Sequence, residues 1–246
     1  MDLSQADQDK LLNFVGYGSL DAPFWFIGME EAGPARPDLL EANLRARLRF
    51  ADAIMDLRQA HDENHLRFPY WDADFHERLP SVWLYAARFV RALRGAADWW
   101  ELEPARAYVR DQLGRAGYAG ETFLTDLLPL PRKRVGDWPP VYRDDLGFSD
   151  LAAYEQAVLP RRKRLLKPLI TEQRPRFLLC YGRSYYAHYR DLVEVQPDRW
   201  RTLPQTRIEI GLASGTTVIL TPFMGSGRLG QSQFEILIEH LPRMNL

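Results

Sequence analysis

The sequence predicts an α/β protein, a three-layer α/β/α sandwich with a central, mostly parallel sheet. Two short apolar runs support this, within "APFWFIGM" at residues 22–29 and "RPRFLLCYG" at residues 174–182. Neither run alternates with polar residues, which is typical of strands buried on both faces. Segments with helical spacing separate the runs along the chain. We therefore expect a single domain over residues 1–246.

In the first half of the chain, the strand at residues 22–28 is bounded by a proline and a glycine. Apolar side chains then recur at helical spacing through residues 36–63, which predicts a helix. The proline- and aromatic-rich residues 68–79 predict a loop. Two further helices are expected at residues 81–100 and 104–117, and the second of them closes on a glycine.

The middle of the chain predicts a second strand and a long helix. The strand passes through Phe123 and Leu124. It is expected to end at Pro129 and Pro131, because proline cannot continue a central ladder. The helix, in residues 150–175, is expected to be interrupted or kinked at an internal proline.

The last third of the chain continues the alternation of strands and helices. A third apolar strand precedes a helix at residues 184–193. Residues 206–211 alternate in polarity and residues 216–223 are β-branched and apolar, so both segments are expected to be strands. Residues 231–241 predict the closing helix.

Composition excludes several classes of protein. The formal net charge of −1 gives no general attraction to nucleic acid, and no apolar run is long enough to cross a bilayer. With Cys180 as the one cysteine, there is no disulfide framework or cysteine-based zinc site. His61 and His65 lie one helical turn apart but lack a spaced third ligand. We expect a cytoplasmic protein without a metal, cofactor or membrane partner.

The basic residues are unevenly distributed. "PRKR" at residues 131–134 and "RRKR" at residues 161–164 are concentrated basic clusters. Most of their side chains are arginine, which forks onto phosphates and carboxylates. The clusters either contact phosphates or form solvated faces.

In an open parallel sheet, ligands bind outside the carboxyl ends of the strands. Residues 28–33, 125–134 and 221–230 are expected to lie at that edge, and residues 180–182 form a fourth candidate segment. The first segment carries Glu30 immediately before Glu31. Carboxylates there either act as a general base or stabilise a cation, or are ordinary loop acids.

The segment "TPFMGSGRLGQSQF" at residues 221–234 places three glycines before a helix. Backbone N–H groups in such a loop can approach an anion. The alternative is a glycine-rich turn with Ser232 or a neighbour as helix cap. The chain lacks the glycine patterns of dinucleotide and phosphate loops, and it lacks the nucleophile elbow of serine hydrolases.

In chain order, "FIGMEEAGP", "FLTDLLPLPRKR", "RPRFLLCYG" and "ILTPFMGSGRLG" resemble the strand-end motifs of the uracil-DNA glycosylase superfamily. The resemblance implies the same three-layer fold and an N-glycosidase that acts on a flipped base in DNA. It places Glu30 at the water-activating position, with Glu31 as the alternative, and Asp126 at the base-reading position. Phe223 or Met224 stands where the family has its catalytic histidine.

The same resemblance implies three sets of site residues. Glu30 and Glu31 would be catalytic, and Asp126 would read the base with Tyr70 or Phe50 stacked on it. An ionised Asp126 only accepts hydrogen bonds, so it would favour an exocyclic amino group. The residues expected to bind DNA or phosphate are Gly225, Ser226, Gly227, Arg228, Arg132, Lys133 and Arg134.

Two other functions remain open from the sequence. The chain is either an enzyme of this kind, with DNA or a nucleotide as its partner, or a non-catalytic binder of nucleic acid or nucleotide on the same fold. A hydrolase of a small glycosidic or phosphorylated metabolite is the third interpretation. The target base and the oligomeric state do not follow from the residues.

Overall fold

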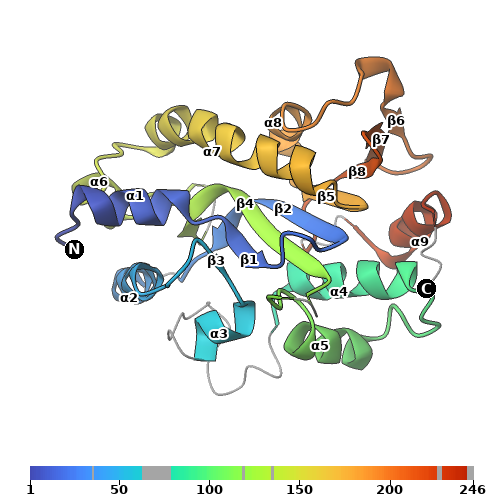
Figure 1. The fold of residues 1–246 in the computed structure, drawn as a ribbon, viewed down its shortest axis with the longest axis horizontal. Coiled ribbons are helices and arrows are strands. Elements are labelled where there is room, and N and C mark those ends of the chain that lie inside the picture. The colour runs from blue at the N-terminus through green and yellow to red at the C-terminus, as the bar shows by residue number, and fades with distance from the viewer. Residues whose placement is uncertain (35, 63–78, 118–119, 134–135, 226–228, 243–246) are drawn as a thin grey trace.

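The computed structural model describes residues 1–34, 36–62, 79–117, 120–133, 136–225 and 229–242. It confirms the α/β class, with helices on both faces of an eight-stranded sheet (Figure 1). The strand order is β3-β1-β4-β2-β5-β8-β7-β6. The four central strands are parallel, while β1 and β7 run antiparallel to their neighbours β4 and β8. The strands are β1 (Gly16–Gly18), β2 (Phe24–Ala32), β3 (Ile54–Met55), β4 (Thr122–Arg132), β5 (Phe177–Tyr181), β6 (Arg201–Thr202), β7 (Glu209–Ala213) and β8 (Thr216–Thr221).

Helices form the two outer layers (Figure 1). One layer contains α1 (Gln5–Asn13), α6 (Pro140–Asp144), α7 (Leu151–Gln173) and α8 (Tyr186–Arg190). The other contains α3 (Leu57–Asp62), α4 (Ser81–Leu93), α5 (Leu102–Asp111) and α9 (Gln231–Glu239). The helix α2 (Pro37–Leu48) contributes to both cores, and the 3₁₀ turns η1 (Arg183–Tyr185) and η2 (Pro197–Arg199) lie near α8 in sequence. Within the ranges given above, no helix is long and apolar enough to cross a membrane.

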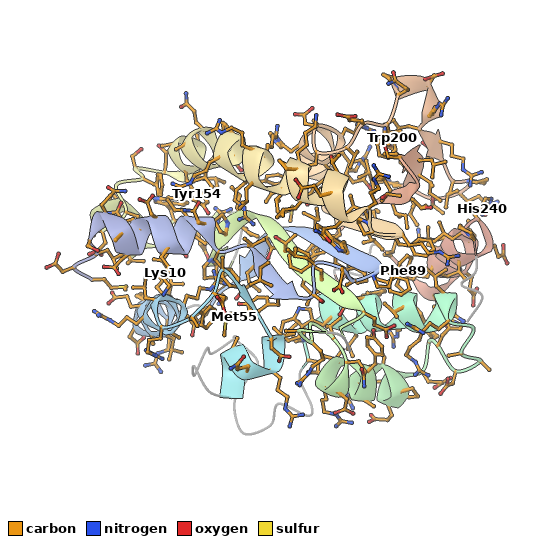
Figure 2. All side chains as sticks on the ribbon, in the orientation of Figure 1. Lys10, Met55, Phe89, Tyr154, Trp200 and His240 are labelled. Atoms are coloured by element: carbon orange, nitrogen blue, oxygen red, sulfur yellow. The ribbon has the colours of Figure 1, made fainter. Side chains whose placement is uncertain are left out.

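The strand β2 supplies side chains to both cores. Phe24 and Phe26 belong to the core beneath α4, whereas Trp25 and Ile27 belong to the core beneath α7. All four are at most 2% exposed. The labelled Phe89 and Tyr154 mark these two cores on opposite sides of the sheet (Figure 2). A strand buried on both faces must be apolar throughout, which explains the unbroken run in the sequence.

The strand β2 extends four residues beyond Gly28, so Glu30 and Glu31 lie in a strand rather than in a turn. Glu30 pairs with Leu128 of β4, and the register shifts between Glu30 and Ala32. Strand pairing satisfies the backbone there. The two carboxylates are accommodated by arginines from elsewhere in the chain.

The prediction that Pro129 and Pro131 end their strand is wrong, because β4 continues to Arg132. Its neighbour β1 pairs with it only as far as Thr125, so one edge of β4 is free of strands from Asp126 onward. Proline is tolerated on such an edge. Side chains bind the backbone there: Arg47 donates to the Pro129 carbonyl at 2.5 Å, and the Leu130 amide donates to the Tyr154 hydroxyl at 3.0 Å.

Two helix predictions also differ from the structure. Residues 36–63 were expected to form one helix, but α2 ends at Leu48 and a turn leads to β3, which pairs with β1. The chain breaks there because the Ala53 carbonyl accepts the Val15 amide at 2.8 Å. The helix α7 instead continues through Pro160, so it is not interrupted there. Burial of apolar residues along its length, such as Val158 and Leu166, offsets the lost backbone hydrogen bond.

Candidate functional site

A pocket of about 100 Å³ lies at the carboxyl ends of β2 and β4. It is the location that the open-sheet rule predicts for a ligand. Acidic and basic side chains from separate parts of the chain meet in it, between aromatic walls. The charged residues that line it are Glu30, Glu31, Arg47, Asp126 and Arg162.

Glu31 is held at the wall of the pocket by α2 and β1. The Arg47 guanidinium and the Tyr17 hydroxyl both donate to its Oε2, the hydroxyl at 3.2 Å. Its Oε1 is buried and accepts no hydrogen bond from a described residue. Burial raises the pKa of Glu31, and Arg47 and the Tyr17 hydroxyl oppose the rise. Glu31 therefore has one fixed oxygen and one that is available to a ligand.

Glu30 is likewise paired with a buried arginine. Arg132 Nε donates to Glu30 Oε2 at 2.6 Å, and Nη2 of the same guanidinium contacts that oxygen. The Arg132 side chain is 1% exposed and lies over the Trp138 ring. Burial raises the pKa of Glu30, and the charge of Arg132 lowers it. Glu30 and Glu31 are thus each paired with a buried arginine, and Glu31 differs in its buried Oε1 without a described partner.

Asp126 is the acid with the most perturbed environment in the pocket. Its Oδ1 is buried without a described hydrogen-bond partner. Burial and then the negative charge of Glu31 raise the pKa of Asp126 to about 8, although Arg162 and Arg47 oppose the rise. The carboxyl is therefore mostly protonated at neutral pH, and it can donate as well as accept a hydrogen bond. The expectation of an acceptor that selects amino groups applies to the ionised form of Asp126.

Gly28 leaves the space that the Asp126 carboxyl occupies. A Cβ at residue 28 would lie 2.1 Å from Asp126 Oδ1 and 2.5 Å from the Tyr181 hydroxyl. Gly28 pairs with Asp126 across β2 and β4, and β5 brings Tyr181 from the other side. The acid and the phenol therefore converge over a residue without a side chain.

Arg162 is a buried cation that contacts the backbone of Asp126. Its Nη1 donates to the Phe14 carbonyl at 2.8 Å, and its Nη2 donates to the Asp126 carbonyl at 2.7 Å. No carboxylate of the described chain forms an ion pair with it. Burial lowers the pKa of Arg162 to about 10. The guanidinium joins β1 to β4 and leaves a positive charge beside the pocket.

The walls of the pocket are aromatic, but not through the residues expected. Phe50 is 1% exposed and packs on Phe14 at 5.5 Å between ring centroids, in the core rather than at the pocket. Its expected role in stacking on a base is therefore not supported, and Tyr70 lies outside the described residues. The aromatic side chains that do line the pocket are Phe14, Tyr17, Phe26, Trp83, Tyr181 and Phe223.

Three of the residues expected to bind phosphate are described, and they differ in exposure. Arg132 points inward to Glu30, whereas Lys133 is exposed. Gly225 is exposed in a left-handed conformation with φ 132° and lies against the Ser81 side chain. Four others, Ser226, Gly227, Arg228 and Arg134, lie outside the described residues.

The "RRKR" cluster is dispersed around α7. Arg161 pairs with Asp9 at 3.0 Å and Lys163 pairs with Asp191 at 2.6 Å, while Arg162 is buried. In the described part of the chain, no three histidine, cysteine or acidic side chains gather in a way that would hold a metal ion.

Sequence reasoning missed Arg47, Arg162 and Tyr17 as parts of the site. The two arginines had a signal, because each lies on the apolar stripe of its helix: Arg47 follows Leu40 and Leu44, and Arg162 lies between Val158 and Leu166. A charged residue on a buried stripe needs a buried partner. Tyr17 had no comparable signal, since its strand has only three residues.

Comparisons with models of protein families, with curated proteins and with solved structures found no match to this chain. Function is therefore inferred from the pocket itself.

Proposed function

We propose that this protein is an N-glycosidase that takes the base of DNA or of a nucleotide into the pocket and hydrolyses its bond to the sugar. The observation that carries the proposal is the buried, unpartnered Oδ1 of Asp126 in a pocket with aromatic walls. A nucleobase has flat apolar faces and a polar edge, so it matches both features.

The size of the pocket agrees with a single ring. An apolar cavity of roughly 150 Å³ in another protein holds benzene, and this pocket is about 100 Å³ and open at Phe223. A buried acid without a partner costs about 1–3 kcal/mol of stability, which a polar edge of the ligand would offset. These features favour a ligand that is planar, small and able to hydrogen-bond along one edge.

The chemistry follows from the two acids. Asp126 gives its proton to the departing base, which takes the electron pair of the broken C–N bond. Glu31, which is paired with Arg47, stabilises the positive charge that develops on the sugar and, in its ionised form, accepts a proton from the attacking water. The water oxygen bonds to the sugar carbon, so the products are the free base and the sugar hydroxyl.

A binding protein without catalysis is the second candidate. It is favoured by the ion pairs of Glu30 with Arg132 and of Glu31 with Arg47, because each arginine reduces the basicity of its carboxylate. In that case the pocket would hold a base without cleaving it.

The two candidates are separated by incubating the protein with nucleosides, nucleotides and oligonucleotides that carry normal or modified bases. Free base is measured by chromatography, and binding is measured in parallel. Asp126→Asn and Glu31→Gln should lower base release by about 100-fold or more, while the exposed Asp198→Asn should not. Binding without base release from any substrate would establish the second candidate, and unchanged release in Asp126→Asn would exclude the acid role.

A further inference from the structure

A second depression lies beside the pocket at the carboxyl ends of β5 and β8. This groove of about 670 Å³ lies between the residues that follow β5 and the turn that precedes β7. Its cationic lining residues are Arg183 and Arg207, and its apolar floor includes Met29 and Phe223. None of the predicted site residues that the structure describes is among its lining residues.

The groove and the pocket adjoin each other at Phe223. Phe223 lines both, and it is 36% exposed. Along β5, Tyr181 lines the pocket and the next residue, Gly182, lines the groove. Gly182 has φ 120°, and a Cβ there would lie 2.5 Å from the Met29 side chain. A ligand with its ring in the pocket can therefore extend past Phe223 into the groove.

The two arginines are exposed and have no internal anion. Neither forms an ion pair with a described residue, whereas nearby Arg190 pairs with Glu209. Two hydrogen bonds fix the turn that carries Arg207: the Tyr186 hydroxyl donates to its carbonyl at 3.0 Å, and the Leu203 amide donates to the Ile208 carbonyl at 2.9 Å. Arg207 thus stands on a fixed turn, and Arg183 begins the 3₁₀ turn η1. They are available to an anion from outside.

We propose that this groove binds the phosphate of a free nucleotide whose base occupies the pocket, so that the substrate class is a nucleoside monophosphate. The inference rests on the proposed function for the position of the base. The charges are the main argument. A phosphate monoester carries about −1.5 to −2 at neutral pH, which two arginines match, and the fork of each guanidinium binds phosphate oxygens in pairs.

A nucleic-acid strand fits these observations less well. A strand carries a charge at every phosphate and is usually held by several cations along its path. The described lining of the groove offers only the two arginines, and the formal net charge of the chain is −1. In the described lining of the groove the positive charge comes from two side chains, which is enough for a single terminal phosphate.

The test is equilibrium binding by calorimetry. The probes are the 5′-monophosphates of adenosine, guanosine, inosine, cytidine and uridine, each nucleoside without its phosphate, and a single-stranded oligonucleotide. At least one monophosphate should bind about tenfold or more tightly than its nucleoside. Arg183→Ala and Arg207→Ala should each reduce that advantage about tenfold. Arg199→Ala, an exposed arginine on η2 outside the groove, should leave it unchanged.

Equal affinity for every monophosphate and its nucleoside would overturn the proposal, as would arginine variants that weaken only the oligonucleotide. Failure of the groove and failure of the glycosidase are distinguishable. Phosphate-dependent binding without base release keeps the groove and removes the glycosidase. Base release that is independent of the phosphate and of both arginines keeps the glycosidase and removes the phosphate site in the groove.

Discussion

The carboxyl of Asp126 occupies the place where a side chain at Gly28 would lie. A Cβ at residue 28 would come within 2.1 Å of Asp126 Oδ1, although the two residues are 98 positions apart in the sequence. The pairing of β2 with β4 sets this contact. The absence of one side chain thus positions the acid on which the proposed chemistry depends.

Gly28→Ala should therefore displace the Asp126 carboxyl and the Tyr181 hydroxyl together. We expect a loss of about 1–3 kcal/mol in the free energy of unfolding, as for other overpacked sites. Binding of the base should weaken about tenfold or more. Gly136→Ala is the control, because a Cβ at Gly136 meets nothing within 4 Å. Denaturant unfolding and ligand titration measure both effects, and equal behaviour of the two variants would refute the contact.

The raised pKa of Asp126 predicts a pH dependence of stability. An aspartate has a pKa near 3.9 in an unfolded chain, whereas Asp126 has a pKa of about 8 in the fold. Between these values the folded state keeps a proton that the unfolded state has lost. The stabilising effect is thus complete below about pH 4 and is lost as the pH rises toward 8, by at most about 1.4 kcal/mol per pH unit.

Asp126→Asn removes this titration. Relative to the wild type, the free energy of unfolding of this variant should rise by about 1 kcal/mol for each pH unit between pH 5 and pH 8. Urea unfolding at four pH values measures the difference. For Asp198→Asn, at an exposed position, the free energy of unfolding should change with pH as it does in the wild type. Parallel curves for Asp126→Asn as well would mean that Asp126 titrates normally.

The buried pair of Glu31 with Arg47 should behave as a unit. Glu31→Gln leaves the Arg47 guanidinium, 2% exposed, without its carboxylate. The expected cost is about 3–5 kcal/mol, mostly from the unpaired buried charge. The double variant with Arg47→Met should therefore lose less than the sum of the single changes, by about 1 kcal/mol or more.

The exposed pair of Arg36 with Asp38 serves as the comparison for these single and double variants. Both side chains are largely in solvent, so Asp38→Asn should leave the unfolding midpoint unchanged. Chemical denaturation of all variants measures the coupling. Additive effects at Glu31 and Arg47 would contradict a buried pair.

The layers of the fold could be predicted from the sequence because they depend on local composition. The run at residues 24–27 and the run in β5 are buried on both faces, so apolar content alone identifies them. Short strands escaped prediction: β3 and β6 have two residues each, too few to show a period. The continuation of β4 through Pro129 depends on Arg47 and Tyr154, which no local pattern reveals.

The position of the candidate site could be predicted from the sequence, but the pairing and protonation of its side chains could not. Glu30, Glu31 and Asp126 were expected at the carboxyl edge, and all three line the pocket. Their protonation and availability depend on arginines that are distant in the sequence. Arg162 lies 36 residues from the Asp126 carbonyl that it binds, and Arg132 lies 102 residues from Glu30. Such pairings are set by the sheet register, which the sequence alone does not fix.

The pH dependence of base release tests the central claim most directly, namely that a neutral Asp126 protonates the departing base. For a substrate that the panel identifies, kcat/KM should be constant between about pH 6 and 7. It should fall about tenfold per pH unit above the pKa of Asp126, near 8. A rate that does not change between about pH 6 and 10, or no base release from any substrate, would contradict the account.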